Sequence, residues 1–297
     1  MSYAIVTDTS ANLPLKMLKE RDILLLAFSY RAEGGQELQQ LDTEDFDGEL
    51  FYEQIRRGAR VTTSQITPYD YETLFTRLLD EGKDILLVSM SSGISGSFSS
   101  ACMAAGELRE RYPDRRIELV DTFSASLGEG LVVLEAAALR EAGVDIQTAA
   151  ERLRALSRRM CQVFTVDDLM YLRRGGRLSN LSAIVGTILN IKPILIGDEE
   201  GRIVAIKKIR GRKHSIQHLA ELYARYADPA SVRLVGIAHA DCPGDAELLR
   251  ALLAETPDPP ENVLNVQYEP VTGSHVGPGA LALFFFSDDQ VRSSIQK

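Results

Sequence analysis

Small hydroxyl-bearing residues and glycines are concentrated in three short segments of this 297-residue chain. The segments are Thr62-Thr63-Ser64-Gln65, Ser91–Ser97 (SSGISGS) and Asp121–Gly128 (DTFSASLG). The second is the sharpest, because it leads from an expected strand into an expected helix. Its glycines permit close backbone approach, its serines supply hydroxyl donors, and a helix start supplies free N–H groups. This combination predicts an anion site, although a single serine in such a position often only caps the helix.

Motifs of the common catalytic loops do not occur. The chain has no GxxxxGK[ST], no GxGxxG and no HExxH, and Gly93-Ile94-Ser95-Gly96 lacks one residue of a nucleophile elbow. Three solitary cysteines, Cys102, Cys161 and Cys242, indicate neither a disulfide nor a zinc site. His214 and His218 stand four residues apart without a convincing third ligand, so we predict no metal and no cofactor.

Two further sequence features could take part in binding, namely a histidine between glycines and two clusters of basic residues. His275 lies in a glycine-rich stretch that suggests a shaped turn. Basic residues form two clusters, which suit partner docking or an anionic headgroup but also an ordinary solvated face. A net charge of −9 argues against a general nucleic-acid binder. The clusters are Arg173, Arg174 and Arg177, and then Lys207, Lys208, Arg210, Arg212 and Lys213.

The elements that must position these residues alternate between strand and helix. This alternation predicts an α/β fold with a largely parallel sheet, in which ligands bind at the carboxyl ends of strands. The expected strands are Tyr3–Thr7, Ile23–Tyr30, Asp84–Met90 and Ile117–Asp121. The expected helices are Thr43–Gly58, Tyr69–Glu81, Ser97–Arg111 and Ala125–Ala142.

A second α/β unit is expected after the helix predicted at Asp145–Arg159. It begins with a strand, Cys161–Val166, and continues through short helices at Asp167–Leu172 and Leu181–Leu189. A hairpin pairs Lys192–Gly197 with Arg202–Ile209 around a turn at 198–201. We therefore predict two closely packed domains, residues 1–160 and residues 161–297.

Composition favours a cytoplasmic globular protein. Apolar residues make up 45% of the chain and charged residues 25%. No signal peptide is recognised at the N-terminus. The apolar stretches Ala183–Gly197 and Ala280–Phe286 fall short of the roughly 18–20 apolar residues that a membrane span needs.

Six blocks along nearly the whole chain resemble the DegV family and occur in family order. They are AIVTDTSANLP (4–14), TTSQITP (62–68), SSGISGSFSSA (91–101), DDLMYLRRGGRLS (167–179), LNIKPIL (189–195) and HVGPGALAL (275–283). The resemblance implies two α/β domains with one long-chain fatty acid buried between them. The N-terminal domain would carry the TTSQ and SSGISG headgroup loops, and the C-terminal domain would close the lipid cavity.

The resemblance also implies a role. Some members resemble the FakB subunit of a bacterial fatty acid kinase, which binds the lipid but no ATP. A separate ATP-binding subunit then phosphorylates the carboxylate to an acyl-phosphate. The chain is thus expected to be a lipid-binding protein and not an enzyme by itself. A tail of roughly fifteen methylenes would gain on the order of 12 kcal/mol on burial, before entropic costs.

Carried over residue by residue, the resemblance implies a carboxylate site and a partner-docking site. The site uses a hydroxyl from Ser92 or Ser95, between which spacing does not choose, an arginine from Arg210 or Arg212, and His275, whose protonated ring would give a charge-assisted bond. The carboxylate-binding residues are Thr62, Thr63, Ser92, Gly93, Ser95, His275, Arg210 and Arg212. The partner-docking residues are Arg173, Arg174 and Arg177. Ile66, where the family often has proline, and Ser97-Phe98, where it often has Thr-Tyr, depart from the pattern.

Two other functions remain open at this point. An acyl-phosphate or acyl-ester hydrolase would use Ser92 or Ser95 as nucleophile, His275 as base and Asp8 or Asp121 as orienting acid. A nucleic-acid or regulatory partner for the basic clusters is the other, and a steep salt dependence of binding would reveal it. These residues do not indicate the chain length or unsaturation of the lipid. They also do not indicate the oligomeric state or whether a kinase partner exists.

Overall fold

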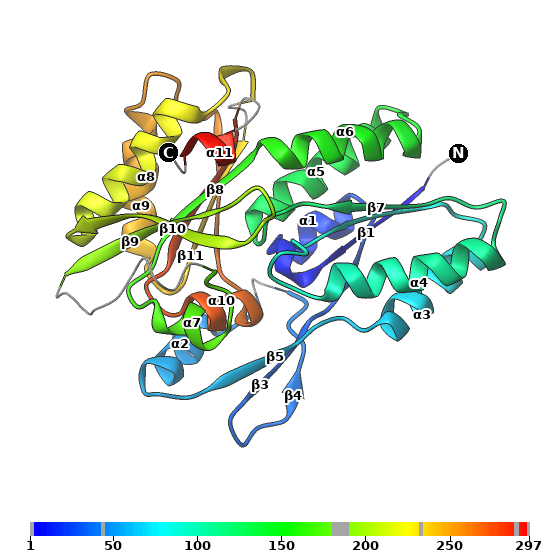
Figure 1. The fold of residues 1–297 in the computed structure, drawn as a ribbon, viewed down its shortest axis with the longest axis horizontal. Coiled ribbons are helices and arrows are strands. Elements are labelled where there is room, and N and C mark those ends of the chain that lie inside the picture. Colours follow the sequence, from blue (N-terminus) through cyan, green and yellow to red (C-terminus); the bar gives the residue numbers. More distant parts are fainter. Residues whose placement is uncertain (1–2, 43–44, 180–189, 232–233, 288–290, 296–297) are drawn as a thin grey trace.

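The computed structural model describes residues 3–42, 45–179, 190–231, 234–287 and 291–295. The helix predicted at Leu181–Leu189 lies outside the described residues. The architecture has two large sheets joined by long helices, with a small third sheet at one side (Figure 1). None of the helices formed by the described residues combines the length and the apolar character that crossing a bilayer requires.

The first sheet is parallel, as the strand and helix alternation predicts. Its strand order is β2-β1-β6-β7, with β1 at Ala4–Asp8, β2 at Ile23–Leu26, β6 at Ile85–Ser89 and β7 at Ile117–Asp121. Side chains alternate between its two faces. One face packs on α3 (Pro68–Asp80) and α4 (Ser97–Arg111), and the other on α5 (Leu127–Glu141) and α6 (Ile146–Arg159).

The second sheet is mixed and mainly antiparallel. Its order is β10-β9-β8-β13-β11-β12, and only β11 and β12 pair in parallel. The strands are β8 (Met160–Thr165), β9 (Ile191–Gly197), β10 (Ile203–Arg210), β11 (Leu234–His239), β12 (Asn262–Gln267) and β13 (Leu281–Phe286). Helices α8 (Arg212–Tyr226) and α9 (Pro243–Ala254) cover one face.

Helix α5 joins the two sheets into one core. It contacts β1 and β6 of the first sheet and β8, β11 and β13 of the second. Its first seven residues are all buried, which agrees with a helix that is enclosed on most sides. The opposite face of the second sheet, with Phe164 and Phe284, belongs to the same apolar cluster as α5. The predicted domain limits, 1–160 and 161–297, stay a prediction.

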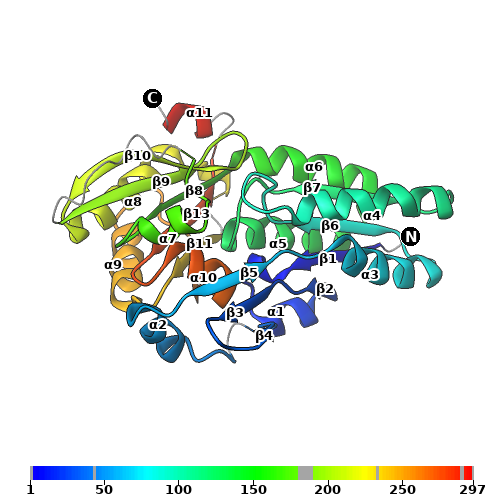
Figure 2. The same cartoon turned by 60° about the horizontal axis from the view of Figure 1, so that its bottom comes forward.

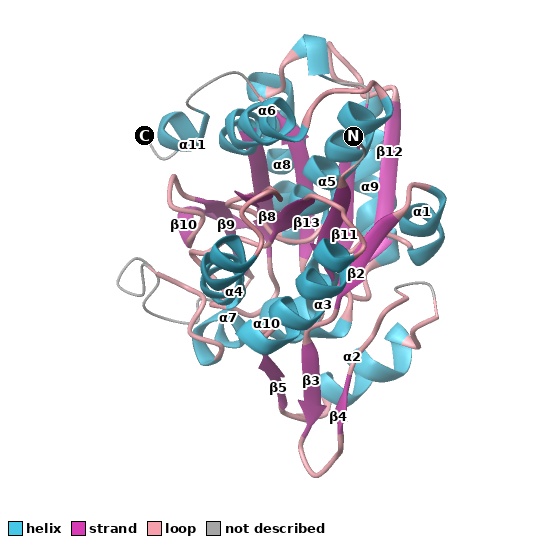
Figure 3. Cartoon of the chain, turned by 90° about the vertical axis from the view of Figure 1, so that its right-hand side faces the viewer, coloured by secondary structure: helices cyan, strands magenta, loops and turns pink. Residues whose placement is uncertain are grey.

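A small antiparallel sheet, β4-β3-β5, extends beside a group of short helices (Figures 2 and 3). Its strands are β3 (Ser29–Ala32), β4 (Glu37–Leu38) and β5 (Val61–Ser64). The nearby helices are α2 (Gly48–Arg56), α7 (Met170–Arg174) and α10 (Pro270–Val276). The remaining short elements are α1 (Leu15–Glu20), α11 (Val291–Ile295) and 3-10 turns at Thr9–Ala11 and Pro229–Ser231.

This small sheet corrects two sequence predictions. The single strand predicted at Ile23–Tyr30 is two strands, because the chain leaves the parallel sheet at Phe28, whose amide donates to Thr9 Oγ1 at 3.1 Å. The predicted TTSQ loop is largely strand β5. Side chains alternate along a strand, so Thr62 and Thr63 point to opposite faces. The helix predicted at Thr43–Gly58 begins only at Gly48, where the Asp47 side chain caps it.

Candidate functional site

A mainly apolar cavity lies within the shared core, and its wall is formed by the second sheet and by the loops that follow β2, β6 and β7 of the first. It encloses about 730 Å³, its opening included. The apolar lining residues are Phe28, Met90, Ile94, Ala125, Phe164, Leu172, Ile203, Tyr268, Val271, Val276 and Phe284. The polar ones are Thr63, Gln65, Ser95, Ser126, Gln162, Arg177, Thr272 and His275. Such a lining, with a few polar groups among many apolar ones, is typical of a small-molecule site.

Thr63 and His275, far apart in sequence, meet at the cavity wall. A hydrogen bond of 2.9 Å joins Thr63 Oγ1 to His275 Nε2. Strand β5 supplies the threonine, and the last turn of α10 supplies the histidine. Glu269 holds the start of α10, because its carboxylate accepts from the amides of Val271 and Thr272.

The imidazole of His275 is neutral at pH 7. Burial, and then the charge of Arg177, lower the pKa of His275 from 6.5 to about 4. The predicted charge-assisted bond from a protonated His275 therefore requires an anion to bind first and raise this pKa. The ring also has little freedom on its other side, since a Cβ on Gly175 would lie 2.4 Å from His275 Nδ1.

Arg177 is the arginine that lines the cavity. Its Nε donates to the Ile94 carbonyl at 3.2 Å, and its Nη1 donates to the Gly175 carbonyl. No carboxylate of the described residues forms an ion pair with it. Its burial lowers the pKa of the guanidinium from 12.5, which still leaves it charged at neutral pH. A half-buried cation held by two backbone carbonyls is suited to an incoming anion.

The serine-rich loop brings Ser95, but not Ser92, to the cavity. Ser95 Oγ accepts from the Ser97 amide at 3.2 Å and lies in the cavity wall. Ser92 is exposed, and its amide points to the carboxylate of Asp121. Gly93 packs against the β9–β10 turn, where a Cβ would approach the Glu200 carbonyl to 2.3 Å. The geometry therefore separates the two serines that spacing left equivalent.

A polar cleft adjoins the cavity on the outside. It holds about 1130 Å³ with its open side included. Thr63, Arg177 and His275 line both spaces, so they stand at the passage between the apolar interior and the cleft. Thr62 and Arg174 line only the cleft, and Arg173 is exposed. We call Thr63, Arg177 and His275 the passage residues.

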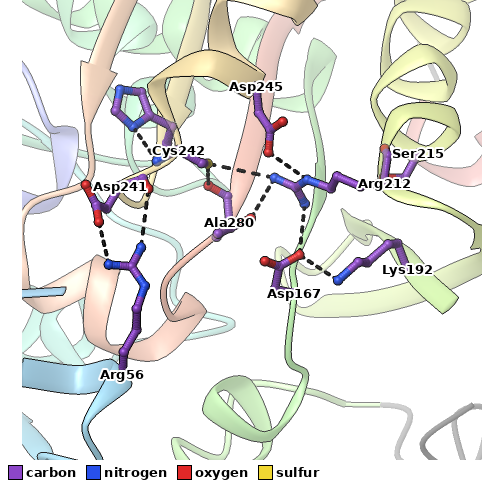
Figure 4. A network of polar contacts seen from close by, with 11 residues as sticks. Arg56, Asp167, Lys192, Arg212, Ser215, Asp241, Cys242, Asp245 and Ala280 are labelled. Atoms are coloured by element: carbon purple, nitrogen blue, oxygen red, sulfur yellow. Dashed lines mark hydrogen bonds and ion pairs between the residues drawn. The ribbon is translucent and has the colours of Figure 1, made fainter. Parts of the chain in front are cut away.

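Arg210 and Arg212 do not line the cavity. Arg212 lies in an ion network, with Nε 2.8 Å from Asp245, Nη1 3.7 Å from Asp167 and Nη2 donating to the Gly279 carbonyl at 2.7 Å (Figure 4). Arg210 is exposed at the end of β10. Both arginines that the resemblance implied for the headgroup thus lie away from the cavity, whereas Arg177, predicted for partner docking, lines it.

The groups of the alternative hydrolase are not assembled. Asp8 is buried and accepts from Ser10 and Ser89 and from the Met90 amide. Asp121 accepts from the amides of the loops. The side chain of His275 hydrogen-bonds to Thr63, so no serine, histidine and aspartate form a relay among the described residues. Nor does that part of the chain gather three histidine, cysteine or carboxylate side chains around a metal position.

Comparisons with known proteins identify similar chains over nearly the whole length. The pattern of the family described as "Uncharacterised protein, DegV family" matches residues 2–288. A DegV domain-containing protein of Clostridium perfringens is 36% identical over 287 residues, which cover 96% of this chain and 98% of the relative.

Solved structures of similar proteins extend the comparison. The structure described as fatty acid binding of a DegV family protein from Thermus thermophilus has a TM-score of 0.87 and 29% identity, covering 97% of this chain and all of that one. A fatty acid binding DegV protein from Bacillus subtilis has a TM-score of 0.82, 29% identity and the same coverage.

Proposed function

Since this chain belongs to the DegV family, we propose that it binds a single long-chain fatty acid. The tail lies in the apolar cavity and the carboxylate at the passage residues. The observation that carries this proposal is the position of Thr63, Arg177 and His275 at the mouth of a mainly apolar cavity. The fatty acid binding of the relatives from Thermus thermophilus and Bacillus subtilis supports it.

The chemistry of the passage suits a carboxylate. Arg177 provides a charged donor, and charge-assisted bonds are roughly twice as strong as neutral ones. Thr63 and Ser95 provide hydroxyls from two sides, which replace the water that a buried carboxylate loses. A carboxylate beside His275 raises the pKa of the imidazole and gives it a second donor role.

Two measurements test the proposal: the amount of fatty acid bound per chain, and the affinity for fatty acid that variants lose. Native mass spectrometry of the purified protein, followed by denaturing extraction, should give one fatty acid per chain. Delipidated protein should rebind a long-chain acid one to one. Thr63→Val, Ser95→Ala and Arg177→Gln should each weaken binding by roughly tenfold or more, as expected for loss of a net 1.5–3 kcal/mol bond to a charged group. Ser92→Ala should leave the affinity within twofold.

Two results would contradict the proposal. A protein that carries no fatty acid and binds none after delipidation has a different ligand. Equal losses for Ser92→Ala and Ser95→Ala would move the headgroup from the cavity wall to the exposed loop. Ser99→Ala, on the exposed side of α4, is the matched control for removing a hydroxyl.

We further propose that a separate ATP-binding kinase subunit phosphorylates the bound carboxylate, which implies a cytoplasmic location. The supporting geometry is the outer cleft, which leads a partner directly to the passage residues. Arg174 lines this cleft, and Arg173, its exposed neighbour in sequence, adds a second positive charge for docking. Arg173→Glu with Arg174→Glu should lower acyl-phosphate formation by the kinase at least tenfold while fatty acid affinity stays constant. Unchanged phosphorylation of the double variant would exclude this surface.

A further inference from the structure

The residue just before α5 reaches the cavity wall in an unusual conformation. Ser126 occupies the N-cap position, where a serine side chain ordinarily accepts from the first turn, but it makes no such hydrogen bond. Its backbone lies at φ 53° and ψ −140°, which is unfavourable for any residue with a Cβ. The side chain is fully buried and lines the cavity, and its hydroxyl has no hydrogen-bond partner in the described structure.

A glycine would occupy this backbone position without strain. The chain instead carries a serine whose hydroxyl neither caps the helix nor pairs with another group. A buried polar group without a partner is unfavourable, so its presence at a binding cavity points to a ligand that supplies the partner.

The groups around Ser126 are donors. The amide of Leu127, in the first turn of the 15-residue helix α5, likewise has no partner in the described part of the chain, and it lies at the positive end of the helix dipole. Gln162 also lines the cavity, and its Oε1 already accepts from the Ala125 amide at 3.3 Å. Its remaining polar group is therefore the NH₂ donor.

The buried guanidinium of Arg292 lies close to this segment, but its hydrogen bonds go to neutral oxygens of the protein. Arg292 donates to Ser124 Oγ at 3.2 Å and to the Phe123 carbonyl at 2.8 Å. Its other donors go to the carbonyls of Met160, Asp198 and Ser157. The positive charge of Arg292 favours an electron-rich ligand atom near Ser126. Because its N–H groups already donate to protein oxygens, this position suits a neutral ligand oxygen better than a second carboxylate.

We propose that Ser126 and Gln162 form a second polar subsite in the cavity wall, which binds a keto or hydroxyl oxygen carried on the acyl chain. This subsite is distinct from the passage residues, because it is built from the start of α5 and from β8. It rests on the proposed function, since the acyl chain must occupy the cavity. The ligand class is therefore an oxygenated fatty acid, with the oxygen at the carbon that reaches Ser126.

The test compares octadecanoic acid with a set of oxo-octadecanoic acids whose keto group moves along the chain. Affinities for delipidated protein are measured by displacement of a fluorescent fatty acid. At least one positional isomer should bind the wild-type protein tenfold or more tightly than octadecanoic acid does. The Ser126→Gly variant removes the hydroxyl without backbone strain, so it should remain folded. Within this variant, the preference for that isomer over octadecanoic acid should fall to twofold or less.

The outcomes separate this inference from the proposed function. If octadecanoic acid binds but no keto isomer is preferred, or if Ser126→Gly keeps the preference, the subsite is wrong and the proposed function stands. If no acid binds at all, both are wrong. Ser99→Ala, on the exposed side of α4, controls for loss of a hydroxyl outside the cavity, and thermal unfolding of Ser126→Gly checks its fold.

Discussion

Acidification should destabilise the lipid-free protein through His275. Burial and Arg177 lower the pKa of His275 from 6.5 to about 4 in the folded state. A base whose pKa is lowered on folding contributes stability that is present above its unfolded pKa and is lost as pH falls. One pKa unit corresponds to about 1.4 kcal/mol. The full difference is therefore about 3 kcal/mol, of which roughly 2 kcal/mol is lost between pH 7 and pH 5.

The assay is urea unfolding of delipidated wild type and His275→Gln at pH 7, 6 and 5. Other titrating groups affect both proteins alike, so the difference between them isolates the imidazole. Wild type should lose about 2 kcal/mol relative to the variant across this range. With fatty acid bound, the adjacent carboxylate raises the pKa of His275, so the relative loss should shrink. Parallel pH profiles of the two lipid-free proteins would refute the buried, neutral imidazole, and an unchanged loss with lipid would refute its contact with the carboxylate.

Three further predictions follow from single positions. Burial raises the pKa of Glu269 from 4.5 to about 7. The free energy of unfolding of wild type should therefore fall by about 2.5 kcal/mol relative to that of Glu269→Gln as pH rises from 5 to 8, measured by urea unfolding. The same pH dependence of stability in both proteins would contradict this. Gly175→Ala places a Cβ 2.4 Å from His275 Nδ1 and should weaken fatty acid binding at least tenfold in a displacement assay, whereas unchanged affinity would show that the ring can shift freely. Gly106→Ala, on the exposed side of α4 with open space around its Cβ, should raise the free energy of unfolding by about 0.5–1 kcal/mol without changing lipid affinity, and a loss of stability would contradict the open geometry.

Local sequence determined the large elements well where the signals were sharp. The predicted helix Ser97–Arg111 and strand Ile117–Asp121 have the same bounds as α4 and β7. The run Ile23–Tyr30 failed because it contains no turn residue at its break. The chain leaves the parallel sheet there to pair with β5, some 30 residues later. Such pairing is set by distant residues and leaves no local pattern.

The sequence indicated the types of polar residue that line the cavity, but not which of the candidates do so. Thr63, Ser95 and His275 stand in recognisable motifs and line the cavity. Arg177 and Arg212 each follow a glycine in sequence, and only the fold turns the first towards the cavity and the second towards Asp245. The only sequence feature that pointed to Ser126 was the segment of small residues before α5. That segment does not indicate the backbone conformation of Ser126 or its unpaired hydroxyl.

The position of the cavity would give the proposed fatty acid both a structural and a functional role. Its wall includes Phe164 and Phe284, which belong to the same apolar cluster as the faces of both large sheets. An acyl chain in this space completes the packing between the sheets, because an apolar void forfeits dispersion contacts on its lining. The proposed headgroup end, by contrast, is built from β5, the segment after α7, and α10, which lie beside the core and open to the outer cleft. The same fatty acid can thus be held firmly by its tail while its carboxylate stays within reach of a second protein.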